Sequence, residues 1–277
     1  MALLVHKYGG SSVANAGKII RVAERVIKAK NAGNDVVVVV SAMGDSTDDL
    51  IELAHTVSND PEPREMDLLL STGELVSCTL LSMAIKSMGH EAVSLTGNQA
   101  GIVTDTVYGH ARISRVDSDR IKQELLKGRV TVVAGFQGMT ETQDITTLGR
   151  GGSDTTAVAL AAALKADRCD IYTDVEGIYT ADPRIVPKAR KMLEIGYQEM
   201  LELASYGAKM HPRSIELGSV YQVPIYVASS FSEETGTLIH KGPDEISMED
   251  RIKVTGIAYQ SNIAKVTVRA VPDRPGM

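Results

Sequence analysis

The chain has 277 residues, of which 43% are hydrophobic and 23% charged, and its net charge at pH 7 is −6. This composition is typical of a globular protein; the lack of a basic block disfavours nucleic-acid binding, and no apolar run approaches the roughly 18 residues of a membrane span. Cys78 and Cys169 stand alone, which predicts free thiols in a cytoplasmic protein and argues against a zinc-type metal site.

Strand and helix patterns alternate along the chain. An apolar run at residues 3–8 predicts a strand, residues 14–30 carry apolar positions at helical spacing, and the five valines at 36–40 are typical of a strand buried on both faces. Further strands are expected at residues 92–95, 130–134, 170–174 and 224–228, further helices at 66–88, 119–127, 154–164 and 197–206, and a hairpin within 136–148. The alternation predicts an α/β fold, a three-layer sandwich with a mainly parallel central sheet.

The composition changes after Gly242. Residues 243–250 are acidic and irregular, two alternating runs follow at 253–258 and 265–271, and the chain stops on the turn-like sequence PDRPGM. We therefore expect one unit over residues 1–242 and the beginning of a second over 243–277. An ending of this kind favours a fragment of a longer protein.

Residues 149–157, GRGGSDTTA, form the most informative stretch of the chain. Adjacent glycines allow close approach of the backbone to a charged group, and Arg150 offers a forked cation for a carboxylate or phosphate. The stretch runs into an Ala/Leu-rich helical segment, so its N–H groups and the helix dipole favour an anion. A glycine turn with a helix cap is the plainer interpretation, but an Arg and an Asp in the same loop favour a binding site.

Polar and glycine residues follow several predicted strands at the point where each strand ends. In open α/β sheets this edge holds the ligand, and recurring Gly, Ser, Thr and Lys fit a phosphate-bearing one. The chain lacks a Walker A loop, the protein-kinase motifs and a dinucleotide fingerprint. What remains is Lys7, backed by Gly9 and Gly10, as a cation that could neutralise a transferring phosphoryl group.

Six motifs occur in the order found in the aspartokinases: KYGGSS at 7–12, SAMGD at 41–45, STGELVS at 71–77, GRGGSDTTA at 149–157, YTDVEGIYTADPR at 172–184 and KMHPR at 209–213. The chain resembles this family over essentially its whole length. The resemblance implies the amino-acid-kinase fold for residues 1–242. From Gly256 onward the chain is similar to the first strands of the α+β regulatory ACT module, the rest of which is absent.

The resemblance implies transfer of the ATP γ-phosphoryl group to the β-carboxylate of L-aspartate, giving 4-phospho-L-aspartate on the way to lysine (through diaminopimelate), threonine and methionine. The acceptor carboxylate, with an ordinary pKa of roughly 4, is already ionised at neutral pH, so no general base is required. Mg²⁺ is expected to bind through the ATP phosphates, with no metal site made by the protein alone. The family also implies a homo-oligomer, with a separate regulatory subunit left open.

The resemblance assigns each site residue a role. Lys7 would lie across the transferring group, with Asp154 and Lys209 completing the catalytic set, while Arg150 would bind the aspartate α-carboxylate and Glu74 its ammonium group. The substrate-binding residues are Ser41, Thr47, Glu74, Arg150, Gly151, Gly152 and Ser153. The ATP-binding residues are Lys7, Tyr8, Gly9, Gly10, Ser11, Thr173, Asp174, Tyr179, Thr180, Asp182, Arg184, Lys209 and Met210.

Plainer interpretations of some positions stay open. Glu74 sits in a long helical pattern where a solvated Glu is common, Asp182 precedes a Pro in what could be an ordinary turn, and His211 has the position of a helix-start residue. At the level of function, the same fold could phosphorylate glutamate, acetylglutamate, carbamate or uridylate. It could also serve as a non-catalytic effector-binding subunit, or be a kinase damaged by truncation.

Overall fold

The computed structural model describes residues 1–208, 210–242 and 254–259. The helices are α1 (Ala16–Asn31), α2 (Ser46–Val57), α3 (Pro63–Ser87), α4 (Asp119–Leu126), α5 (Gly152–Leu164), α6 (Tyr197–Ser205), α7 (Pro212–Tyr221) and the short 3₁₀ helix η1 (Gly10–Ser12). The strands are β1 (Leu3–Tyr8), β2 (Asp35–Val40), β3 (Ala92–Leu95), β4 (Ile102–Thr104), β5 (Ile113–Val116), β6 (Val130–Ala134), β7 (Gln137–Met139), β8 (Ile145–Thr147), β9 (Arg168–Thr173), β10 (Glu194–Gly196), β11 (Ile225–Ser229) and β12 (Thr237–His240).

Eight strands form the central sheet in the order β10-β12-β11-β9-β1-β2-β6-β3. Neighbours from β11 to β3 run parallel, and β12 is antiparallel to β11. A second sheet, β5-β4-β7-β8, contains the expected hairpin, since β7 and β8 pair antiparallel. The prediction of a mainly parallel sheet is confirmed.

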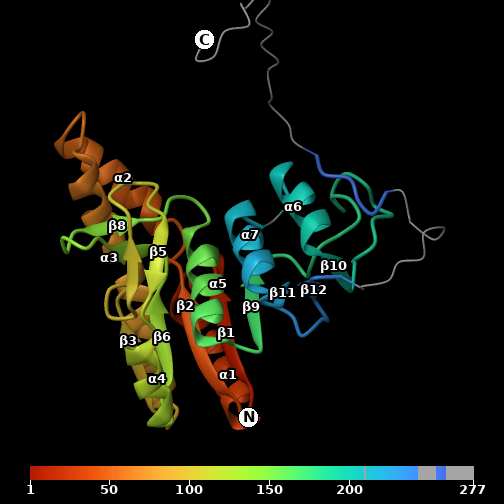
Figure 1. Ribbon diagram of the computed structural model, residues 1–277, viewed down its shortest axis with the longest axis horizontal. Helices are drawn as coiled ribbons and strands as arrows, with labels where there is room; N and C mark the ends of the chain where they lie inside the picture. Colours follow the sequence, from red (N-terminus) through yellow and green to blue (C-terminus); the bar gives the residue numbers. More distant parts are fainter. Residues whose placement is uncertain (209, 243–253, 260–277) are drawn as a thin grey trace, which may run out of the picture.

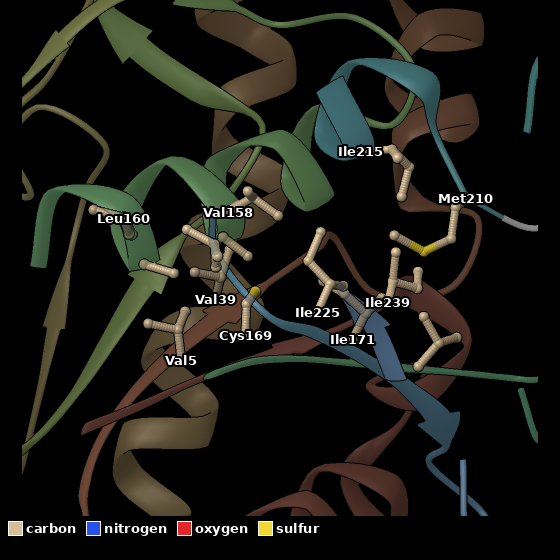
Figure 2. Packing of buried hydrophobic residues seen from close by; sticks show 14 of the residues in the cluster. Val5, Val39, Val158, Leu160, Cys169, Ile171, Met210, Ile215, Ile225 and Ile239 are labelled. Carbon is tan, nitrogen blue, oxygen red and sulfur yellow. The ribbon is translucent and has the colours of Figure 1, made fainter. Parts of the chain in front are cut away.

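Helices cover both faces of the central sheet, as the layers in Figure 1 show. Side chains alternate along a strand, so Val37 and Val39 of β2 pack on the side of α5, whereas Val36, Val38 and Val40 pack on the side of α1 and α3. Figure 2 shows the first of these two cores, where Val5 and Val39 meet Val158 and Leu160 of α5. The run of five valines is therefore explained by burial on both faces, and the three-layer sandwich is confirmed.

Helix α3 is long and apolar enough to cross a membrane by length and composition, which the sequence analysis did not expect of any segment. Half of its most apolar stretch is buried inside the protein. Leu81 and Ile85 pack in the core on the side of α1. A core helix of a globular fold has this composition, and its place in the sandwich accounts for it.

Several elements were not predicted: α2, the short strands β4, β5, β10 and β12, and α7 beyond its start, which the position of His211 had suggested. The alternating run at 253–258 suggested a strand, but residues 254–259 form none. The run at 265–271 and the turn at 272–277 lie outside the described residues, as does most of the unit expected over 243–277.

Candidate active site

The carboxyl ends of the parallel strands meet at one edge of the sheet. Tyr8, the last residue of β1, is in register with Val40 at the end of β2 and with Tyr172 near the end of β9. Beyond β1 the chain turns sharply through η1, where a Cβ on Gly10 would lie 2.8 Å from the carbonyl oxygen of Ala42. Only a glycine fits so close to the loop after β2. The prediction that the glycine and hydroxyl residues share one edge is confirmed.

Lys7 and Asp154 form an ion pair at this edge. Alternation along β1 places His6 and Tyr8 on the face of α1 and directs Lys7 to the face of α5, whose first turn carries Asp154. The Lys7 Nζ lies 2.7 Å from Asp154 Oδ1, and both side chains are about nine-tenths buried (11% and 12% exposed). Because the ion pair is largely shielded from water, the orientation of the Lys7 side chain is fixed. Its ammonium group lies at the cavity above the strand ends.

The loop before α5 depends on left-handed glycines. Gly149 and Gly151 have φ values of +75° and +71°, and a Cβ on Gly151 would lie 2.4 Å from the ring of His211. The helix begins at Gly152, and its first turn, including Ser153, is buried. Arg150 is exposed and makes no hydrogen bond or ion pair with any residue that the structure describes. The loop therefore presents an unpaired guanidinium beside a helix N-terminus, where an anion is favoured.

Glu74 lies on the buried side of α3 and is 3% exposed. Its Oε1 accepts a hydrogen bond of 3.2 Å from the N–H of Ala42, but its Oε2 is buried with no hydrogen-bond partner among the described residues. Burial raises the pKa of this carboxyl from 4.5 to about 8, and the bond from Ala42 only partly offsets the shift. This burial excludes the interpretation of Glu74 as a solvated surface residue. Its second oxygen, which has no partner among the described residues, can accept a hydrogen bond from a bound ligand.

These groups line one cavity of about 660 Å³. It contains Lys7, Gly10, Ser41, Thr47, Glu74, Arg150, Gly151, Gly152, Ser153 and Asp154, which were all predicted site residues. Its cation and anion ends, Arg150 and Glu74, come from different elements and face the same space. The cavity is of the size and kind that holds a small charged metabolite.

Other residues of this cavity were not singled out in the sequence. Phe136 follows β6 with a left-handed φ of +67°, and His55, Asp67 and His110 also line the wall. Asp67 accepts hydrogen bonds from the N–H of Gly109 and from the N–H and hydroxyl of Thr147. Phe136 is marked in the sequence only by its place just after a predicted strand. Nothing local marks His55, Asp67 and His110, because they reach the site through long-range packing.

A second cavity, of about 450 Å³, holds part of the predicted nucleotide set. Asp174, Tyr179, Asp182 and Arg184 line it. The Asp182 carboxylate accepts hydrogen bonds from the backbone N–H and the guanidinium of Arg184, and this pairing lowers the pKa of Asp182. The Asp-Pro turn is therefore present, and Arg184 lines the cavity with its guanidinium paired to Asp182.

The C-terminal described segment also reaches this cavity, which the sequence analysis did not anticipate. The N–H of Ile257 donates to the Thr180 carbonyl at 2.8 Å, and Ile257 and Tyr259 line the cavity. Thr180 thus contributes its backbone to holding this segment.

Of the other predicted ATP residues that the structure describes, none lines either cavity: Tyr8, Gly9, Ser11, Thr173, Thr180 and Met210. Tyr8 and Met210 are buried, so neither side chain is available to a ligand. Ser11 is exposed in η1, and Thr173 ends β9 with its hydroxyl donating to Asp174 at 3.1 Å. Lys209 lies outside the described residues. His211 caps α7, where its ring accepts from the N–H of Arg213, as its interpretation as a helix-start residue predicted.

A sequence profile of the amino acid kinase family matches residues 2–229, most of the chain. The chain belongs to the amino acid kinase family. The chain is 56% identical, over 278 aligned residues, to an aspartokinase of Mycolicibacterium smegmatis. The match covers 100% of this chain and 66% of the relative, so the chain spans just under two thirds of that relative's length.

Solved structures of the family show the same architecture. An aspartate kinase from Synechocystis superposes with a TM-score of 0.79 at 51% identity, over 89% of this chain and 41% of that one. Aspartokinase III of E. coli, solved in complex with aspartate and ADP, superposes with a TM-score of 0.77 at 30% identity, over 88% of this chain and 65% of that one. The amino-acid-kinase fold expected from the resemblance is confirmed.

Proposed function

We propose that the chain is an aspartate kinase that transfers the γ-phosphoryl group of ATP to the β-carboxylate of L-aspartate. The observation that carries the proposal is the first cavity, where neither one oxygen of the buried Glu74 nor the Arg150 guanidinium has a partner among the described residues. An ammonium group and an α-carboxylate are the complements of these two charges. A free amino acid fits both, whereas an acetylated amine would leave Glu74 without a cationic partner.

The chain's own groups would act by position and charge. Asp154 fixes Lys7 at 2.7 Å, and Lys7 would stabilise the charge that builds up on the phosphoryl group during transfer. Because the acceptor carboxylate is already ionised, the site needs no base to activate it. Ser41, Thr47 and the glycine-rich turn before α5 would hold the acceptor in line with the nucleotide.

ATP would occupy the second cavity and reach the turn formed by Gly9, Gly10 and Ser11. The predicted ATP residues Thr173 and Lys209 are sequence neighbours of Asp174 and Ala208, which line that cavity. Among the described residues, no cluster of three or more His, Cys, Asp or Glu side chains could hold a metal ion. Mg²⁺ would be held by the phosphate oxygens of the nucleotide, where it would neutralise phosphate charge. Lys7 and Asp154 would complete the charge balance at the transfer point.

We further propose that residues 1–242 form the catalytic unit, that 243–277 begin an ACT-like regulatory module, and that the native protein is a homo-oligomeric cytoplasmic enzyme. The relatives are longer than this chain, which supports a missing regulatory part. Light scattering of this chain beside a version extended to the relatives' length tests whether assembly depends on that part.

The test of the function is ADP production from MgATP with L-aspartate, beside glutamate, acetylglutamate and UMP as acceptors. We expect turnover with aspartate alone, lost in Lys7→Ala and retained in Lys86→Ala, an exposed lysine in the last turn of α3. Turnover with another acceptor would overturn the assignment of aspartate. Nucleotide binding without turnover would favour a non-catalytic subunit or a damaged kinase, and absence of binding would overturn the site itself.

A further inference from the structure

The loop at residues 229–233, after β11, lies against the turn that follows β1. The hydroxyl of Ser12 in η1 donates to the Ser230 hydroxyl at 2.8 Å, and Ser230 in turn donates to the Thr173 carbonyl at 3.1 Å. The Ser230 N–H donates to the same carbonyl at 2.8 Å. One hydroxyl therefore joins three chain segments: the turn after β1, the end of β9 and the loop itself.

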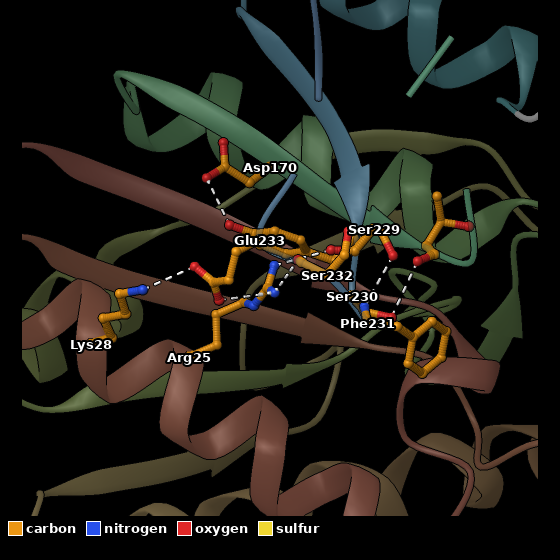
Figure 3. Close-up of polar contacts among 10 residues, drawn as sticks. Arg25, Lys28, Asp170, Ser229, Ser230, Phe231, Ser232 and Glu233 are labelled. Atoms are coloured by element: carbon orange, nitrogen blue, oxygen red, sulfur yellow. Dashed lines mark hydrogen bonds and ion pairs between the residues drawn. The ribbon is translucent and has the colours of Figure 1, made fainter. Parts of the chain in front are cut away.

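Helix α1 holds this loop in place, as Figure 3 shows. The Arg25 guanidinium donates to the carbonyls of Ser229 (3.0 Å) and Ser232 (2.7 Å), and it stacks 4.8 Å from the ring of Tyr172 on β9. Its side chain is only 18% exposed. A planar fork that binds two carbonyls at once fixes the loop's backbone in a way that a flexible ammonium group would not.

A second anchor lies two helical turns earlier on the same face of α1. Lys18 donates to the Ser11 carbonyl at 2.8 Å and lies 5.1 Å from the ring of Phe231. Residues seven apart on a helix share a face, so Lys18 and Arg25 hold the turn and the loop from one side. Helix α1, which begins just after the η1 turn, therefore contacts both that turn and the loop at residues 229–233.

The η1 turn contains backbone N–H groups that are available to a ligand. The N–H groups of Gly10 and Ser11 make no hydrogen bond to any acceptor in the described part of the chain, whereas that of Ser12 bonds to Gly9 at 2.9 Å. Free N–H groups at a sheet edge favour a phosphate, and their affinity for it depends on how rigidly the turn is held.

We infer that Ser230, held by Arg25, is a positioning residue for the nucleotide phosphates. It sets the place of the Gly10 and Ser11 amides relative to the end of β9 and touches no substrate itself. The inference rests on the proposed function, because it takes that turn to be where the ATP phosphates bind. Ser230 lies outside every motif that pointed to the function.

The test compares Ser230→Ala with Ser230→Thr, which keeps the hydroxyl, and with Ser232→Ala. Ser232 is a matched control in the same loop, because its hydroxyl is buried with no hydrogen-bond partner among the described residues. Calorimetry measures the affinity for MgADP and for adenosine, which lacks the phosphates. Thermal unfolding of each variant establishes that it is folded.

Ser230→Ala removes the hydroxyl's bonds with both Ser12 and Thr173. Because they act on the phosphates only through the turn, we expect MgADP binding to weaken about three- to tenfold, the size of one net hydrogen bond, with adenosine binding unchanged. Ser230→Thr and Ser232→Ala should bind MgADP as the unaltered chain does. Equal losses for MgADP and adenosine, or no loss in Ser230→Ala, would overturn the positioning role while leaving the kinase proposal intact. Failure of the unaltered chain to bind MgADP would overturn both.

Discussion

Replacing Glu74 by Gln should stabilise the substrate-free protein while damaging its site. The carboxyl has a pKa of about 8 in the folded chain against an ordinary 4.5, so between these pH values the folded state binds a proton that the unfolded state has released. The free energy of unfolding therefore falls as pH rises through this window, by about 1.4 kcal/mol per unit and roughly 3 kcal/mol by pH 7. A neutral amide carries no such penalty and can still accept the bond from Ala42.

Urea unfolding at pH 5, 6 and 7 measures this effect. The difference in unfolding free energy between Glu74→Gln and the unaltered chain should widen by about 2–3 kcal/mol from pH 5 to pH 7. Glu52→Gln is the matched control, since Glu52 is exposed on α2 and its replacement should leave the pH dependence unchanged. The change with pH is the decisive quantity, because any pH-independent packing effect of the amide cancels.

Parallel pH curves for Glu74→Gln and the unaltered chain would refute the reasoning, since Glu74 would then titrate alike in the folded and unfolded states. If Glu74→Gln is more stable but turns over aspartate undiminished, the burial argument stands and the proposed contact of Glu74 with the substrate ammonium group is wrong.

Three further perturbations test how the site is held. Gly151→Ala should cost about 1–2 kcal/mol of stability and most of the aspartate turnover, because its Cβ would lie 2.4 Å from the His211 ring at a left-handed φ; a melting curve and turnover like those of the unaltered chain would contradict this. Asp67→Asn keeps one acceptor oxygen for the donors of Gly109 and Thr147, so we expect a loss of about 1–3 kcal/mol in urea unfolding. The control Asp60→Asn, at an exposed position outside the helices, should show none. Arg213→Met removes the guanidinium that binds the carbonyls of Leu148 and Ala111, and steady-state kinetics should show KM for aspartate rising more than KM for ATP, whereas equal rises would mean a general loss of structure.

The six parallel strands of the central sheet from β11 to β3 were predictable because their signal is local. The valines of β2 are buried on both faces, and β3 and β6 have the bounds that their apolar runs predicted. Helix α2 was missed for the opposite reason: none of its residues is buried, so it lacks the apolar stripe that marks a core helix. The short strands β4 and β10 have three residues each, too few for a periodicity to show.

The site residues likewise fall into those with a local sequence signal and those without one. Arg150 stands in a glycine-rich turn, and Lys7 and Asp154 stand directly beside such turns, which are visible in the sequence. The structure brings the three residues together at one cavity. His55, His110 and Asp67 reach that cavity through packing between segments distant in sequence, which no local pattern encodes. The same holds for Ile257, whose bond to Thr180 joins residues 77 positions apart in the chain.

Glu74 shows why sequence similarity and physical chemistry are both needed. Within the helical pattern of α3 it is indistinguishable from a solvated residue, and only the resemblance of its motif assigned it a role. The structure supplies the physical reason: the carboxyl is buried, one of its oxygens has no hydrogen-bond partner among the described residues, and the group is costly to ionise. An ammonium group entering the cavity would supply the missing donor and favour the ionised form, so ligand binding near neutral pH should release a proton. A group that destabilises the empty protein and is relieved by its ligand is expected at a functional site, and selection for stability alone would replace it.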